Sequence, residues 1–120
     1  VYLIAAEAAV KTGDAAKMTE GLKYLNAIVQ RANPANSVTV TDYTLDRVLE
    51  ERRKELVGEG HRYFDLLRNG SKYQRQGGSQ YNTATTMEIS WDYYRCVMPV
   101  PLDQFVLNPA LQQNPEYAIK

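Results

Sequence analysis

The sequence predicts a mainly α-helical fold of tetratricopeptide-like helix pairs, followed by a long irregular loop and a C-terminal tail. Apolar residues recur at helical spacing from Tyr2 to Leu67, as in helices that bury one face. Residues that cap or end helices stand between these periodic segments. From Ser71 to Arg95 the chain is rich in Gly, Gln, Asn, Ser and Thr, a composition typical of a loop. In the tail, a short helical turn is expected at Leu102–Leu107.

Two helices are expected at Tyr2–Lys11 and Ala15–Arg31, from alanine and leucine content in the first and an apolar stripe in the second. Gly13 is the expected left-handed cap of the first helix, and Asp14 the expected N-terminal cap of the second. Helices joined by so short a turn must pack antiparallel. The pair resembles one tetratricopeptide unit, but no second copy follows at the period of about 34 residues, so an ordinary helical hairpin is the alternative. Gly21 is expected to weaken the second helix by about 1 kcal/mol relative to alanine.

A third helix is expected to begin at Thr41 or Asp42. Gly58 and Gly60 should break it, because glycine is unfavourable in a helix interior. A further helical piece should follow the two glycines, and Asn69-Gly70 should end that piece as a C-terminal cap.

The third helix carries an arginine, Arg52, on a face that is otherwise apolar. Burying an unpaired charge costs on the order of several kcal/mol, so Arg52 is expected to have a carboxylate partner. Glu55 and Glu59 follow it on or beside the same face and are the expected partners. Charged residues continue at helical spacing into the next piece. The sequence therefore predicts a structural ion network of Arg52, Glu55, Glu59, Arg62, Asp65 and Arg68.

Aromatic side chains in the polar loop are the candidates for ligand binding. Flat aromatic rings with polar edges suit the apolar ring faces of sugars. The alternative is that these side chains fill the core beneath a long loop, which the spread of nine tyrosines over the whole chain favours. The candidate residues are Tyr81, Trp91, Tyr93 and Tyr94.

Charge and motif content argue against several classes of function. Lys and Arg total 14 and Asp and Glu total 14, so nucleic-acid binding has no electrostatic support. The single cysteine, Cys96, allows no internal disulfide and no cysteine metal cluster. The lone histidine, His61, lacks the spacing of a metal motif, and no phosphate-binding loop occurs, so neither a metal nor a cofactor is expected. No apolar run approaches the ~20 residues of a membrane span.

Glu51 and Glu55 provide the one catalytic alternative, because two carboxylates one helical turn apart can be brought to the spacing used by glycosidases. Arg47, Arg52 and Arg53 lie around the pair, however. Nearby positive charge favours the ionised carboxylate, whereas a general acid must hold its proton. No catalytic residue is therefore predicted. An enzyme would need both carboxylates in an open cleft and free of arginine partners.

Three segments of the chain together form a specific pattern. The strongest is an ungapped run that includes Glu51, Arg52, Arg53, Glu55, Leu56, Glu59, Gly60, Arg62, Asp65, Leu66 and Arg68. The other two are the hairpin region, with Tyr2, Leu3, Ala5, Ala6, Glu7, Ala8, Gly13, Leu25, Asn26, Arg31 and Ala32, and the tail, with Pro99-Val100-Pro101, Asn108-Pro109, Leu111, Gln113-Asn114-Pro115 and Tyr117. In this order they resemble the SusD/RagB family, the nutrient-binding outer-membrane lipoproteins of Bacteroidetes.

The resemblance implies that residues 1–120 are one C-terminal helical region of a longer protein. It implies no catalysis, and a surface-exposed location at the outer membrane, with a lipid anchor on an N-terminal cysteine that this chain lacks; Cys96 is not that cysteine. The partner implied is a SusC-type TonB-dependent transporter, which receives captured glycans or peptides. In this family the ligand pocket is generally built upstream, so the charged signature residues are expected to be scaffold.

A helical-repeat scaffold that binds another protein is the alternative to nutrient uptake. It predicts further repeats of about 34 residues upstream and no export signal. The sequence does not indicate which nutrient would be bound.

Overall fold

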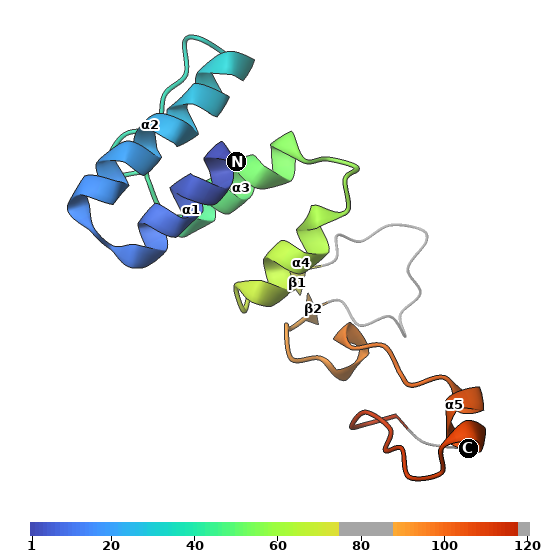
Figure 1. Cartoon of the computed structure of the whole chain (residues 1–120). Coiled ribbons are helices and arrows are strands. Elements are labelled where there is room, and N and C mark those ends of the chain that lie inside the picture. Colours follow the sequence, from blue (N-terminus) through green and yellow to red (C-terminus); the bar gives the residue numbers. More distant parts are fainter. Residues whose placement is uncertain (75–87, 118–120) are drawn as a thin grey trace. The chain divides into compact units, whose positions relative to one another are not determined.

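The computed structural model describes residues 1–74 and 88–117. Over those residues the chain is mainly helical, with five α-helices and one two-stranded sheet, which confirms the predicted all-α class (Figure 1). The elements are α1 (Tyr2–Thr12), α2 (Ala15–Ala32), α3 (Leu45–Glu55), α4 (His61–Arg68), β1 (Tyr73–Gln74), β2 (Glu88–Ile89), a 3-10 turn (Tyr94–Cys96) and α5 (Leu102–Leu107). The chain divides into two compact units, Val1–Arg62 and Tyr63–Lys120.

The helical hairpin of α1 and α2 forms as predicted, each helix one residue longer than expected at its C-terminal end. Gly13 ends α1 with φ 67°, in the left-handed region that glycine adopts without strain. Its N–H donates to the carbonyl of Ala9 over 3.3 Å. The Asp14 carboxylate caps α2 by accepting the backbone N–H of Lys17 over 2.9 Å. Both caps are therefore confirmed.

The core of the first unit lies where α1, α2, α3 and the α2–α3 connection meet. Figure 1 shows α1 beside both α2 and α3. Each element contributes apolar side chains that are less than a tenth exposed, as expected for amphipathic helices that bury one face. The buried cluster is Leu3, Ala6, Leu25, Val29, Val38, Tyr43 and Val48.

Gly21 is a requirement of this core, which corrects its interpretation as a weak point of α2. The Tyr43 hydroxyl enters between the two helices and donates to the Ala6 carbonyl over 2.6 Å. A Cβ atom at Gly21 would lie 2.6 Å from the Cβ of Ala9 and closer still to the Tyr43 hydroxyl oxygen. The absence of a side chain is therefore what admits Tyr43. Burial raises the pKa of the Tyr43 hydroxyl, so it remains a donor at neutral pH.

The connection from α2 to α3 is held by a side chain that imitates a backbone partner. Asn26 donates its Nδ2–H to the Val38 carbonyl over 3.0 Å, and its Oδ1 accepts the Val38 N–H over 2.6 Å. The expected start of the third helix, at Thr41 or Asp42, is wrong. α3 begins at Leu45, because the Thr44 hydroxyl caps it by accepting the Arg47 N–H over 3.2 Å.

The glycines predicted to end the helical pieces do so. α3 stops at Glu55, and Gly58 and Gly60 have φ of 81° and 75° before α4 begins. Gly70 has φ 62° after the end of α4. Its N–H donates to the Leu67 carbonyl over 3.1 Å. Gly70 thus follows α4 in a left-handed conformation, whereas α3 ends at Glu55, three residues before Gly58, and the two positive-φ glycines keep the connection from continuing as a helix.

The segment predicted as an irregular loop contains more structure than expected. β1 and β2 pair antiparallel, with Tyr73 opposite Ile89, and a 3-10 turn follows at Tyr94–Cys96. Lys72 and Glu88 form a 2.9 Å ion pair next to the sheet. Strands of two residues are too short to show alternation, so the sequence carried no signal for them.

The tail folds back through side chains that bond to the backbone. Gln113 accepts the Val100 N–H over 2.8 Å and donates to the Val100 carbonyl over 3.0 Å. Asn114 donates to the Met98 carbonyl over 2.6 Å, and the Tyr117 hydroxyl donates to the Val97 carbonyl over 3.0 Å. These bonds give a physical reason for the Gln113-Asn114 element of the tail pattern. α5 occupies the residues predicted, Leu102–Leu107.

We predict that Gly21→Ala lowers the free energy of unfolding by about 1–3 kcal/mol through overpacking, although alanine is the better helix former. Chemical denaturation measures this change. Lys23→Ala, at an exposed position of the same helix, is the control and should stay within about 0.5 kcal/mol of the parent. A Gly21→Ala protein as stable as the parent would show that Tyr43 does not need the space.

Candidate functional site

A buried ion pair joins α1 and α3. Arg52 is 8% exposed, as its position on the apolar face predicted, and its Nε lies 3.9 Å from Oε2 of Glu7, which is 4% exposed. Glu7 also pairs with Lys11 over 3.1 Å. Glu7 was not expected as a partner of Arg52. Its signal in the sequence is a carboxylate on the helix face that also carries the buried residues Leu3 and Ala6, the counterpart of Arg52 on the apolar face of α3.

The carboxylates considered for catalysis both have arginine partners. Glu51 accepts from Arg47 over 2.8 Å, and Glu55 accepts from Arg31 of α2 over 2.5 Å. An enzyme of the kind considered needed both groups free of arginine and open to a substrate. Glu51 is only 7% exposed. The geometry therefore argues against the glycosidase alternative.

The remaining members of the predicted network lie in the α3–α4 connection and in α4. Asp65 is 4% exposed and accepts from Arg68 over 2.5 Å and 3.1 Å. Glu59 lies 3.8 Å from His61, with both side chains about half exposed. Arg62 is exposed. The structure thus shows charged pairs within each unit, and their assignment to one structural network stays a prediction.

Two of the four aromatic candidates pack into a small cluster. The rings of Tyr93 and Tyr94 are 4.9 Å apart, and Tyr94 and Tyr117 are 5.2 Å apart, both pairs edge to face. The Tyr94 hydroxyl also accepts a 2.8 Å bond from Arg95 Nε. Tyr93 and Tyr94 are half-buried. Each packs against another tyrosine ring, which favours a structural role over contact with a ligand. Tyr81 lies outside the described residues.

Of the three candidates that the structure describes, Trp91 is the most open to solvent. The residue is 54% exposed. The indole lies against Gly70, where an added Cβ would be 3.7 Å from Cδ1 and Nε1 of Trp91. An exposed indole combines a flat apolar ring with a polar edge, which suits contact with a sugar ring.

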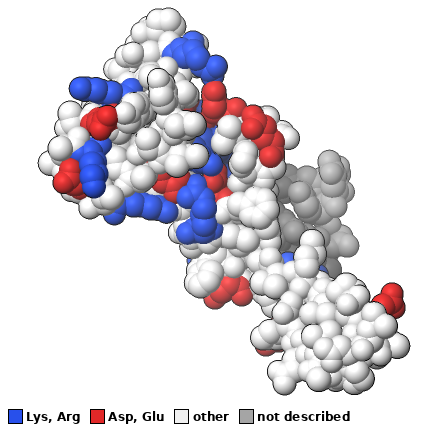
Figure 2. Space-filling view, in the orientation of Figure 1, with Lys and Arg blue, Asp and Glu red and all other residues white. Residues whose placement is uncertain are grey.

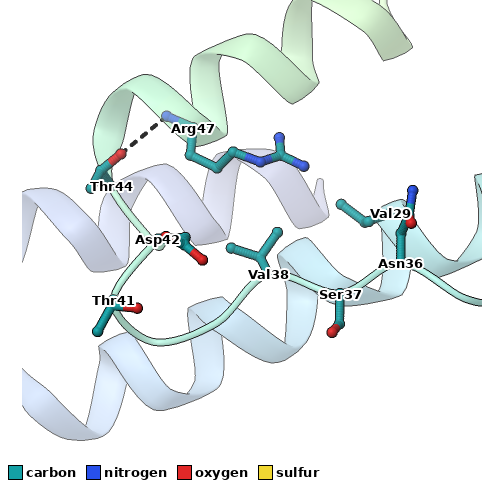
Figure 3. A pocket seen from close by; sticks show the side chains of 8 residues that line it. All are labelled: Val29, Asn36, Ser37, Val38, Thr41, Asp42, Thr44 and Arg47. Atoms are coloured by element: carbon teal, nitrogen blue, oxygen red, sulfur yellow. Dashed lines mark hydrogen bonds between the residues drawn. The ribbon is translucent and has the colours of Figure 1, made fainter.

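A pocket in the first unit was not anticipated from the sequence. It has a volume of about 520 Å³ and opens to solvent between α2, the α2–α3 connection and the start of α3 (Figure 3). The residues that line it are Val29, Asn36, Ser37, Val38, Thr41, Asp42, Thr44 and Arg47. Most stand in an irregular connection, where no periodic spacing marks a common face. Only the fold brings them together.

Charge is unevenly distributed along the chain. Figure 2 shows Lys, Arg, Asp and Glu side chains gathered over the helices of the first unit. Residues 97–117 carry two charged side chains, Asp103 and Glu116. Among the described residues, no group of three or more His, Cys, Asp and Glu side chains could hold a metal ion. No helix in the described ranges has both the length and the apolar character needed to cross a membrane.

The model of the SusD family matches residues 1–117. The chain belongs to this family. Its curated relatives include two proteins of Formosa agariphila, SusD-like protein P25, 28% identical over 95% of the chain, and SusD-like protein P38, 32% identical over 98% of the chain. The chain spans 22% and 23% of the lengths of these relatives.

Solved structures agree with this assignment. A SusD superfamily protein of Bacteroides vulgatus is 57% identical, with a TM-score of 0.90 over 98% of this chain and 26% of that one. A second protein of Bacteroides vulgatus, described as a candidate sugar binding protein, is 49% identical, with a TM-score of 0.81 over 98% of this chain and 27% of that one. The chain therefore matches about a quarter of each solved relative, and that quarter has the same fold.

We predict that Arg52→Ala lowers the free energy of unfolding by about 3–5 kcal/mol, because it leaves the carboxylate of Glu7 buried without this partner. Chemical denaturation of the two proteins provides the comparison. Arg53→Ala removes the same side chain from the neighbouring exposed position and should change stability by less than about 0.5 kcal/mol. Equal effects of the two substitutions would contradict the assigned burial.

Proposed function

We propose that the chain is part of a non-catalytic nutrient-binding protein that captures glycans or peptides. The observation that carries this proposal is the SusD family match over residues 1–117. The similarity to a candidate sugar binding protein, at 49% identity, favours a glycan as the ligand. The arginine partners of Glu51 and Glu55 support binding without catalysis.

The proposal extends to the place of the protein in the cell. It is a lipid-anchored protein on the outer surface of the outer membrane, and it passes its ligand to a SusC-type TonB-dependent transporter. This chain is then the C-terminal region, residues 1–120, of a protein about four times as long. The lengths of the relatives support this, as do exposed apolar side chains in the tail that further protein would cover, including Met98 at 85% and Val106 at 82%.

Within such a protein the charged signature residues of the unit Val1–Arg62 are scaffold, because they are engaged in pairs such as Arg52 with Glu7 and Arg31 with Glu55. The unit that follows carries Trp91, whose exposed indole contributes a stacking surface. The main ligand pocket is formed upstream of this chain. The family match favours this arrangement over a helical-repeat scaffold that binds another protein.

The direct test of the proposed function uses the whole protein in two assays. Isothermal titration calorimetry with a panel of oligosaccharides and peptides should find saturable binding without any change in the ligand. Fractionation of cells should place the protein in the outer membrane, where it should co-purify with a TonB-dependent transporter. A protein that hydrolyses a panel member, or that remains in the cytoplasmic fraction, would contradict the proposal.

We predict that Trp91→Ala weakens glycan binding by about 5- to 150-fold, the loss expected when a stacked aromatic contact worth about 1–3 kcal/mol is removed. Trp91→Phe keeps a flat ring and should retain most of the affinity. Phe64→Ala, which removes another exposed ring of the same unit, is the control for loss of an aromatic side chain alone. Unchanged affinity in Trp91→Ala would remove this loop from the ligand site.

A further inference from the structure

We propose that the pocket between α2 and α3 binds a small, neutral, hydroxyl-rich molecule such as a single sugar unit. The expectation that this molecule is a sugar rests on the proposed function. The site itself is separate from Trp91, because all of its lining residues belong to the unit Val1–Arg62. Its volume of about 520 Å³ lies within the ~300–1,000 Å³ typical of ligand sites.

The walls of the pocket are fixed by contacts already formed in the fold. Val29 and Val38 are 6% and 7% exposed and supply its apolar part. Asn26 holds both backbone polar groups of Val38, and the Thr44 cap fixes the chain where it enters α3. Figure 3 shows the Arg47 side chain reaching from α3 across this space toward Val29 and Asn36. Walls held in this way need little ordering when a ligand binds.

The charges around the pocket disfavour anions and do little to hold cations. Arg47 is already paired with Glu51 over 2.8 Å, so its charge is balanced. An anion would meet the carboxylate of Asp42, which is a lining residue. A cation would gain only a solvent-screened attraction to Asp42, which is exposed. A neutral ligand needs no charge partner and avoids the cost of desolvating an ion.

The neutral polar groups of the pocket match a polyol. Asn36 and Ser37 carry both donor and acceptor capacity. The hydroxyl groups of Thr41 and Thr44 already bond to Thr39 over 2.8 Å and to the Arg47 N–H over 3.2 Å, and offer a ligand the capacity that these bonds leave. The Asp42 carboxylate is oriented by the Thr39 hydroxyl, which donates to its Oδ2 over 2.5 Å, and a carboxylate can accept from two adjacent hydroxyl groups. A sugar hydroxyl also donates and accepts. The apolar C–H face of the same sugar can then rest on Val29 and Val38.

Methyl NMR of the whole protein tests this site without interference from a ligand pocket elsewhere. The probes are free glucose, galactose, mannose and xylose, each titrated to about 50 mM, well above the millimolar affinity expected of so open a site. With valine methyl labelling, the resonances of Val29 and Val38 report on the pocket, and those of Val10 and Val48 report on the core away from it. We expect saturable shifts at Val29 and Val38 with at least one sugar, and none of comparable size at Val48.

Asp42→Asn keeps the shape of the side chain and removes its charge, so it should weaken that binding about tenfold. Asp46→Asn, at an exposed position in the first turn of α3, is the matched control and should leave the affinity unchanged. Unchanged valine shifts in the ligand-free variants show that both proteins are folded. Absence of saturable shifts at both valines with all four sugars overturns the site, as does equal affinity in Asp42→Asn and the parent. Failure of the proposed function is distinguishable, because it appears as absent oligosaccharide binding in calorimetry.

Discussion

The pairing of Glu7 with Arg52 is the contact on which the first unit depends. One charge comes from α1 and the other from α3, and both side chains are more than nine-tenths buried. Burying either charge is costly unless it is paired, so the pairing favours the register of the two helices that brings the groups together. Once α3 is fixed against α1, the α2–α3 connection has fixed ends. Tyr43 and Val38, both in that connection, then enter the core, and the pocket takes its shape.

The sequence predicted most of this architecture because its signals are local. Caps at Gly13 and Asp14, and breaks at Gly58 and Gly60, are properties of single residues and their immediate neighbours. What could not be predicted depends on contacts between distant segments. The need for glycine at position 21 arises from Tyr43, which is far away in sequence. The same holds for the pocket, whose lining residues share no periodicity.

Burial separates scaffold from binding surface in this chain. The charged signature that carries the family resemblance contains the buried residues Glu51, Arg52 and Asp65, which favours the predicted structural role over contact with a ligand. The tail pattern is similar in kind, because Gln113 and Asn114 bond to backbone groups. Candidates for ligand contact stand instead in connections, where Trp91 and the pocket residues were placed by the fold. Binding residues on loops carried by a rigid framework are the usual arrangement in proteins.

A double-mutant cycle on the buried pair tests the central claim most directly. Glu7→Gln and Arg52→Met keep approximate side-chain size while removing one charge each, and chemical denaturation of the parent, both single variants and the double variant gives their coupling free energy. The account predicts a coupling of about 1 kcal/mol or more, with the double variant more stable than the sum of the single losses implies. A coupling below about 0.3 kcal/mol would show that the two charges act independently, and would contradict the claim that their pairing fixes α3 against α1.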